Sequence, residues 1–157
     1  MLLSLIPEQF NQNNIILEDK QKNIILDNGD FYRIYYSDEN VCLNGVFVNF
    51  SLKNAMIEPY FNKIKCSFDG HSNKKTINYL KNIEKSILQT ITIPGKKICR
   101  IEEQLSNCFI KIFSDSDKIK KKFEKLNILL KISGIWQNKN EYGITFRFFF
   151  THPLEMP

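Results

Sequence analysis

The sequence of 157 residues predicts a mainly β fold built around one long helix. Most apolar residues lie in short runs rich in β-branched and aromatic side chains, and Asn, Asp and Gly separate these runs, which is typical of short strands. Only the segment Thr76–Ile91 spaces its apolar residues by three and four, which indicates a helix with one buried side. The sequence shows no repeat, linker or low-complexity block. We therefore interpret residues 1–157 as a single domain.

The first part of the chain is expected to form a β-meander. The turn Asp27–Asp30 joins two strands as a hairpin, and Asn44-Gly45 marks another tight reversal. The strands expected before the helix are Ile15–Glu18, Asn23–Leu26, Phe31–Tyr36, Val41–Leu43, Val46–Leu52 and Lys63–Phe68. Between the last two, Asn54–Asn62 contains Pro59 and is interpreted as a loop or a single helical turn.

The predicted helix Thr76–Ile91 has recognisable signals at both ends. Ser72 or Asn73 can cap its N-terminus, and Pro94-Gly95 prevents it from continuing. The stripe expected to be buried consists of Ile77, Leu80, Ile83, Ile87, Leu88 and Ile91.

The chain after the helix is expected to end in a hairpin. Its strands are Leu129–Trp136 and Ile144–Phe150, joined by the turn-rich segment Gln137–Gly143. Gly134 predicts a bulge or a close backbone approach. The segments expected before this hairpin are a strand at Lys97–Ile101, a short helix or loop at Glu102–Asn107, a strand at Cys108–Phe113, and a lysine-rich loop or helix at Asp115–Lys125.

Short strands with turns between them and a single long mid-chain helix fit a small OB-type β-barrel. In this architecture, a sheet face and the connecting loops bind single strands or oligomers. The fold class predicted from the sequence is therefore mainly β, an OB-type barrel with one long mid-chain helix.

Composition argues against several classes of protein. The apolar N-terminus Met1–Ile6 is short, lacks a basic region and is followed by Pro7, so it fits neither a signal peptide nor a membrane span. The four cysteines are solitary and are expected to be free thiols. We expect a soluble protein of a reducing compartment, neither secreted nor bound to a membrane.

The sequence offers little for catalysis. His71 and His152 have no metal-site spacing, and no glycine-rich phosphate loop is present. Two acidic pairs, Glu102-Glu103 and Asp115 with Asp117, could hold a metal, although acids beside loops are usually only solvated. We expect no enzymatic activity, no cofactor and no metal.

The sequence offers more for binding. Residues 94–157 contain 12 basic and 7 acidic residues, a net charge of +5, whereas residues 1–93 are neutral overall. Strand alternation in this part places cations beside aromatic rings on the face opposite the core: Phe109, Lys111 and Phe113 on one strand, and Lys131, Arg147 and Phe149 on the terminal hairpin, with Lys97 or Arg100 nearby. Cations that follow phosphates and rings that stack on bases are what single-stranded nucleic acid requires.

Each of these side chains also has a structural interpretation. Phe109, Phe113 and Phe149 can pack under a helix or loop, and Trp136 can either stack on a base or cap the barrel. The lysine run that includes Lys121 and Lys122 is either a solvated face or an electrostatic funnel.

The terminal hairpin also resembles a known family. The string Leu130-Lys131-Ile132-Ser133-Gly134-Ile135-Trp136, followed by Glu141-Tyr142-Gly143-Ile144-Thr145-Phe146-Arg147-Phe148, resembles the C-terminal hairpin of viral OB-fold single-stranded-DNA-binding proteins. These are replication proteins of nucleo-cytoplasmic large DNA viruses, insect DNA viruses and Maverick-type elements, akin to those of short-tailed coliphages. Glu102-Glu103-Gln104-Leu105 and Phe109–Phe113 also look like that family's pattern, so the similarity covers about the last third of the chain.

The resemblance implies a non-catalytic protein that coats exposed strands during viral DNA replication or recombination, in the host nucleus or at a cytoplasmic replication site. It implies binding through Lys111, Lys131, Trp136, Tyr142 and Arg147. With the face described above, the full candidate set is Lys97, Arg100, Lys111, Phe113, Lys121, Lys122, Lys131, Trp136, Tyr142, Arg147 and Phe149. The expected partners are single-stranded DNA, with RNA as an alternative, and replication proteins. The phage proteins end in an acidic tail that recruits such proteins, whereas Thr151–Pro157 contains one acid, Glu155.

Two other functions remain open at this stage. The first is a virion or host-interaction protein on a β-barrel or sandwich scaffold, whose exposed aromatic residues contact a protein. The second is an enzyme such as a nuclease, which would need a carboxylate cluster.

Overall fold

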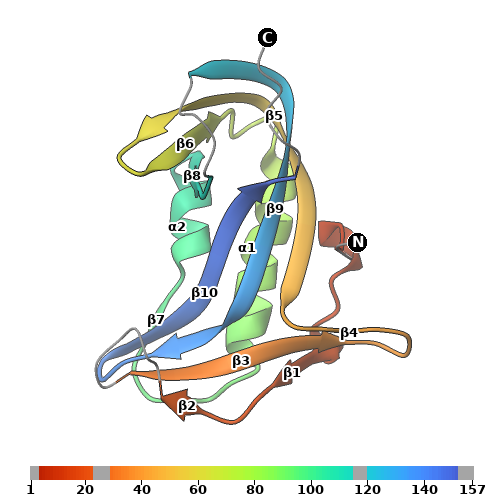
Figure 1. Cartoon of the computed structure of the whole chain (residues 1–157), viewed down its shortest axis with the longest axis vertical. Coiled ribbons are helices and arrows are strands. Elements are labelled where there is room, and N and C mark those ends of the chain that lie inside the picture. The colour runs from red at the N-terminus through yellow and green to blue at the C-terminus, as the bar shows by residue number, and fades with distance from the viewer. Residues whose placement is uncertain (1–3, 23–28, 115–119, 152–157) are drawn as a thin grey trace.

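A closed five-stranded barrel forms the centre of the protein. The computed structural model describes residues 4–22, 29–114 and 120–151. The barrel strands are β5 (Val46–Tyr60), β6 (Lys63–Phe68), β8 (Phe109–Ile112), β9 (Lys121–Gln137) and β10 (Glu141–Phe150), which follow the order β5-β6-β8-β10-β9 around the ring (Figure 1). The β8 and β10 strands are parallel, and the other neighbours in the ring are antiparallel. The predicted mainly β, OB-type barrel with a long mid-chain helix is confirmed.

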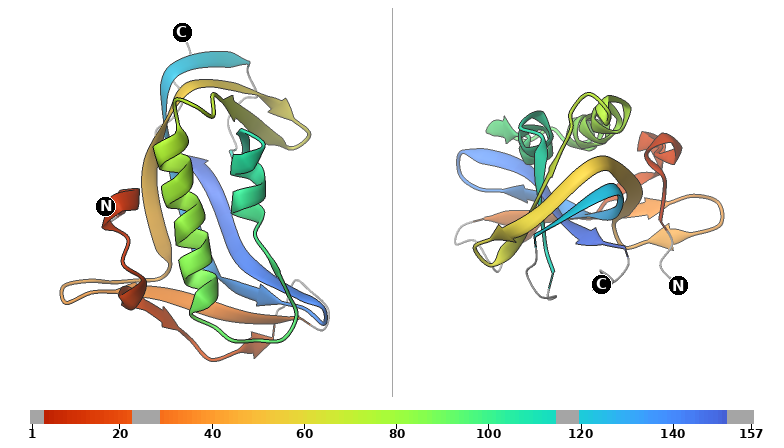
Figure 2. Two further views of the ribbon diagram at one scale, coloured as in Figure 1. Left: turned by 180° about the vertical axis from the view of Figure 1, so that it is seen from behind. Right: turned by 90° about the horizontal axis from the view of Figure 1, so that it is seen from above.

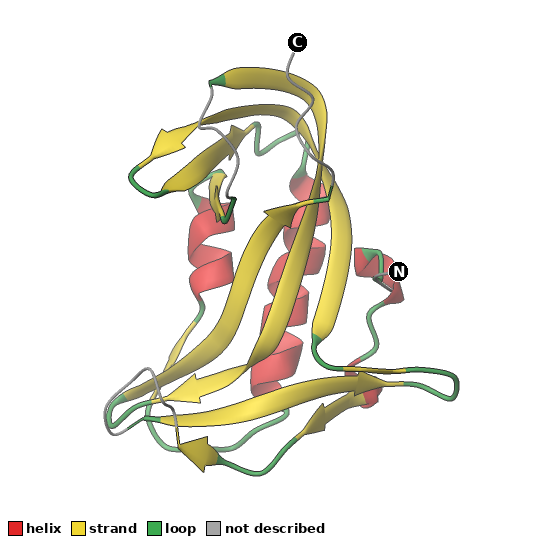
Figure 3. Cartoon of the chain, viewed as in Figure 1, coloured by secondary structure: helices red, strands yellow, loops and turns green. Residues whose placement is uncertain are grey.

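A smaller sheet extends one end of the barrel. The strand β3 (Asp30–Ser37) pairs with the C-terminal part of β9 and carries three short strands: β1 (Ile15–Leu17), β2 (Gln21–Lys22) and β4 (Cys42–Leu43). On the other side, β7 (Lys96–Ile98) pairs in parallel with the start of β10. The long strands β9 and β10 therefore belong to both the barrel and this extension (Figure 3).

The helices lie behind β9 and β10 in the view of Figure 1 and in front in the reversed view of Figure 2. They are α1 (Lys74–Gln89) and the shorter α2 (Arg100–Ser106), with two 3-10 turns, η1 (Pro7–Gln9) and η2 (Gln12–Asn14), near the N-terminus. Five of the six residues in the predicted stripe are buried in one core with the barrel interior, and Ile91 lies just after the helix and is half-buried. Asn73 occupies the N-cap position, but its side chain binds the backbone of Lys53 instead of capping α1.

The terminal hairpin is confirmed and contains the predicted irregularity at Gly134. Gly134 faces Thr145, whereas the next pair is Ile132 with Phe146, so Ser133 is the extra residue of a bulge. A Cβ at Gly134 would clash with the carbonyl oxygen of Tyr32 on β3. Gly134 is therefore required where two backbones approach closely.

Three segment predictions were wrong. Asn54–Asn62 is not a loop, because β5 bends at Asn54, whose φ is 52°, and continues to Tyr60. Pro59 is tolerated there because the pairing with β9 ends at Ile57, so that beyond this point one edge of β5 has no strand partner among the described residues. The expected strand Lys97–Ile101 ends at Ile98, and its last two residues begin α2.

The third concerns the lysine-rich segment. Residues 121–125 are neither loop nor helix but the start of β9, held in an extended conformation by pairing with β5 from Lys53 to Ile57. The expected strand Asn23–Leu26, Asp115, Asp117 and His152 lie outside the described residues.

Candidate nucleic-acid interface

A groove of about 590 Å³ lies beside α2, β8 and β10. Four of its lining side chains are cationic, and Glu103 is the single acid among the described residues that line it. The cations are Lys63, Arg100, Lys111 and Arg147, and the aromatic residues are Phe109, Phe113, Trp136, Phe146 and Phe148. The groove therefore combines positive charge with apolar rings, as the sequence predicted for this part of the chain.

Strand alternation in β8 places residues on the wall of the groove as expected. Ile110 and Ile112 point into the barrel and have no exposed surface, whereas Phe109, Lys111 and Phe113 line the groove. The guanidinium of Arg147 on the neighbouring β10 lies 4.8 Å from the centre of the Phe113 ring. Such a contact holds the arginine over the ring while its N–H groups stay available to an anion.

Phe149 belongs to the same aromatic group, although it does not line the groove. Its ring contacts Phe113 edge to face, with 6.3 Å between the ring centres. Phe113 itself is 41% exposed, so a ring surface remains accessible beside Arg147. Arg147 and the partly exposed Phe113 ring thus stand together at the surface.

The turn between β5 and β6 adds aromatic residues that the sequence analysis missed. Phe61 at its tip is 86% exposed, and its ring packs edge to face on Tyr60 at 4.9 Å. The amino groups of Lys65 and Lys111 lie 5.9 Å and 5.5 Å from the Tyr60 ring, and Lys65 lies 4.8 Å from Phe109. These residues were missed because this stretch was interpreted as a loop. The sequence offers little signal for this part of β5, because Met56 between the buried Ala55 and Ile57 is itself apolar and hides the alternation.

Trp136 forms part of the groove lining but is largely buried. It is 8% exposed, and the guanidinium of Arg100 lies 5.3 Å from its ring centre. A Cβ at Gly143 would contact the indole at 3.0 Å, so the ring is also closely packed against β10. Of the two roles that the sequence left open, this placement favours packing, because very little of Trp136 is exposed for stacking on a base.

The remaining predicted residues lie outside the groove lining. Lys131 stands in register between Arg147 and Phe47, with its amino group 5.8 Å from the Phe47 ring. The structure brings five of the candidates together in the groove, namely Arg100, Lys111, Phe113, Trp136 and Arg147. Four further candidates lie elsewhere. Lys97 and Tyr142 are paired residues of the neighbouring strands β7 and β10, and Lys121 and Lys122 are the first residues of β9, where it pairs with β5.

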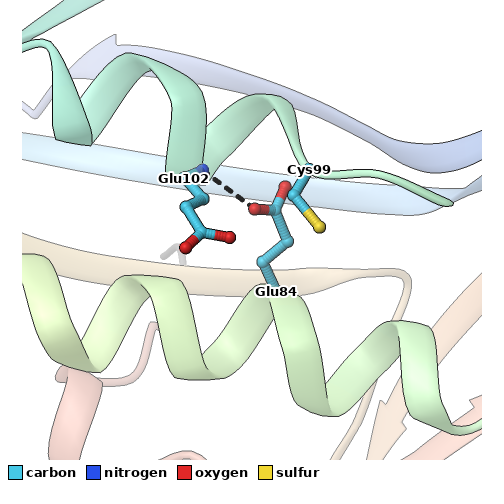
Figure 4. A group of neighbouring side chains, drawn as sticks. All are labelled: Glu84, Cys99 and Glu102. Atoms are coloured by element: carbon cyan, nitrogen blue, oxygen red, sulfur yellow. Dashed lines mark hydrogen bonds between the residues drawn. The ribbon is translucent and has the colours of Figure 1, made fainter.

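A buried carboxylate fixes the helix that forms one wall of the groove (Figure 4). Glu84 of α1 has no exposed surface, and its two oxygens accept hydrogen bonds from the backbone N–H groups of Ile101 at 3.0 Å and Glu102 at 2.9 Å. These bonds satisfy two of the four backbone N–H groups that have no partner within the helix at the start of α2. Burial raises the pKa of Glu84 above its ordinary value, because the charged form loses hydration.

The same cluster contains the groups that could hold a metal. Ligand atoms of Glu84, Cys99 and Glu102 lie within 4.8 Å of one another. Both oxygens of Glu84 already accept backbone hydrogen bonds, and Glu102 pairs with Lys85 at 3.5 Å. These contacts give the cluster a structural role, because they hold α2 against α1. The sequence suggested Glu102 and Glu103 as an acidic pair. In the structure Glu102 belongs to this cluster, whereas Glu103 lines the groove.

Comparisons with protein-family models, curated proteins and solved structures found no match. Among the described residues, no helix has both the length and the apolar character needed to cross a membrane.

Proposed function

We propose that the protein binds single-stranded DNA along the groove beside α2, β8 and β10. The observation that carries this proposal is the close placement of cations and rings, above all Arg147 on Phe113 and Lys111 beside Tyr60. Cations track the phosphates, while rings stack on bases of any sequence, and each stacked base contributes about 1–3 kcal/mol. Binding of this kind is strongly weakened by salt, because contacts to phosphates release counterions.

The biological role is proposed from the resemblance of the terminal hairpin. The protein coats exposed strands during viral DNA replication or recombination, in the host nucleus or at a cytoplasmic replication site, without catalysis and without a cofactor. RNA is the alternative ligand, and replication proteins are the candidate partners.

Fluorescence anisotropy tests the proposal directly. Labelled oligo-dT, oligo-rU and duplex DNA are titrated with protein over a series of salt concentrations. The expected result is tight binding to the DNA strand that weakens steeply with salt, with the duplex bound much more weakly. No binding to any of the three at low salt would refute the proposal.

A protein partner is the second candidate, for a virion or host-interaction protein. It is favoured by Phe61, because an aromatic ring that is 86% exposed at a turn is also a typical anchor for a protein surface. Under this alternative, oligo-dT leaves the melting temperature unchanged, and Phe61→Ala abolishes capture of the partner that co-purifies with the wild-type protein.

A further inference from the structure

The acid in the groove is poorly placed for contacts to a phosphate backbone. Glu103 shares the groove with four cations, yet it forms no ion pair within the described part of the chain. A carboxylate at this position repels phosphates. Glu103 is exposed and lies in the first turn of α2, where a carboxylate is favoured, but the backbone N–H groups of Ile101 and Glu102 are already satisfied by Glu84. The Glu103 carboxylate, placed in a groove that is otherwise cationic, is suited to a ligand group that donates hydrogen bonds.

The next residue of α2 supplies a donor on the same wall. The side-chain oxygen of Gln104 accepts a hydrogen bond from the backbone N–H of Lys111 at 3.0 Å, which fixes the orientation of the amide. Its Nε2 has no hydrogen-bond partner among the described residues, although Gln104 lines the groove. Both residues line the groove, so this wall offers a carboxylate, which only accepts, and an amide nitrogen, which only donates.

We propose that this wall recognises the edge of a guanine base, an inference that rests on the proposed binding of single strands. Guanine offers two neighbouring N–H donors, from ring N1 and exocyclic N2, next to the acceptor O6. The two oxygens of Glu103 accept from N1 and N2, and Nε2 of Gln104 donates to O6. Adenine, cytosine and thymine each present a single donor group on this edge, so none of them satisfies both carboxylate oxygens. Charge-assisted pairs of this kind are about twice as strong as neutral ones.

The test compares oligothymidylate of about 12 nucleotides, within the usual site sizes of OB folds, with the same strand carrying one central guanine, inosine or cytosine. A single guanine avoids association between guanine-rich strands. The expected result is at least about fivefold tighter binding of the guanine strand, because a good bidentate base contact contributes about 1–3 kcal/mol. Inosine lacks the N2 amine, so the preference is expected to fall sharply with that base.

Glu103→Gln is the diagnostic variant, and Glu102→Gln is its matched control. Both variants remove one acid from the same helical turn, but Glu102 faces α1, whereas Glu103 lines the groove. Glu103→Gln is expected to abolish the guanine preference while affinity for plain oligothymidylate stays equal or rises. The control is expected to keep the preference.

Two outcomes overturn the inference alone, and a third overturns the proposed function with it. Equal affinity of the wild-type protein for the thymine and guanine strands would overturn base recognition while leaving single-strand binding intact. Equal affinity for inosine and guanine would overturn the role of the carboxylate and needs no variant. Absence of binding to every strand at low salt would refute the proposed function as well, so the two failures are distinguishable.

Discussion

Removal of two groove cations, in the double variant Lys111→Ala/Arg147→Ala, should flatten the salt dependence of binding. The groove has four cationic side chains, so single-strand binding that uses all of them has a slope of log affinity against log salt of about −2.8. Two remaining cations would give a slope of about −1.4. A rise from about 50 to about 200 mM salt should therefore weaken the wild-type protein about 50-fold and the variant about sevenfold.

The assay is anisotropy of labelled oligo-dT at several salt concentrations, with thermal unfolding as a check on the fold. The matched control is Lys74→Ala/Lys75→Ala, which removes the same charge from exposed positions on α1 that do not line the groove. Its slope should equal that of the wild-type protein. An unchanged slope in Lys111→Ala/Arg147→Ala would refute the phosphate-contact role of both residues. An equal decrease in both variants would show that net charge, and not the groove, governs binding.

Three further predictions concern the turn, the buried acid and the bulge. Phe61→Ala should weaken oligo-dT binding by about 1–3 kcal/mol without changing the salt slope, because the variant loses the stacking of one base but no charge. The control is Ile16→Ala, which changes another exposed apolar residue. An altered salt slope in Phe61→Ala would contradict stacking. The pKa of Glu84 is raised by burial, so the stability it contributes is fully present below the ordinary carboxyl pKa of about 4.3 and is lost as pH rises through the raised value. Urea unfolding from acidic to neutral pH should then show the wild-type protein losing stability relative to Glu84→Gln as pH rises, and a constant difference would contradict the buried charge. Gly134→Ala should destabilise the protein by about 1–3 kcal/mol in urea unfolding, because the added Cβ would clash with the carbonyl oxygen of Tyr32. The control Ser133→Ala, at the adjacent residue, should change the stability little. An unchanged stability of Gly134→Ala would contradict the close approach of the two backbones.

Local patterns were enough to predict the elements whose contacts lie close in sequence. The three-and-four spacing in α1 places Leu80 and Ile87 in the core because a helix repeats every 3.6 residues. The alternation in β8 separates Ile110 and Ile112 from Lys111 because a strand repeats every two residues. The hairpin turn and the Gly134 bulge were likewise visible from turn residues and one glycine.

Part of the candidate site was predictable for the same reason. Lys111, Phe113 and Arg147 were identified by alternation, and the structure places them in one groove. The aromatic turn was not identified, because Asn54 and Pro59 are residues typical of loops. The strand β5 nevertheless continues past both residues, because its residues from Ala55 on pair with β6 and those up to Ile57 pair with the distant β9. Local propensity yields to such pairing when a strand buries its core face.

The sequence by itself determined which residues have a buried side and which segments turn, because these depend on periods of two and 3.6 within one segment. The tertiary structure alone decided which segments pack against one another. Trp136 is buried because Arg100 of α2 and Gly143 of β10 pack against its indole, and neither contact can be seen in the local pattern of β9. Glu84 appears from the sequence to be one more charged helix residue, yet it is fully buried because the N–H groups at the start of α2 satisfy its carboxylate. Both outcomes depend on contacts between segments far apart in the chain, and a local pattern carries no information about such contacts.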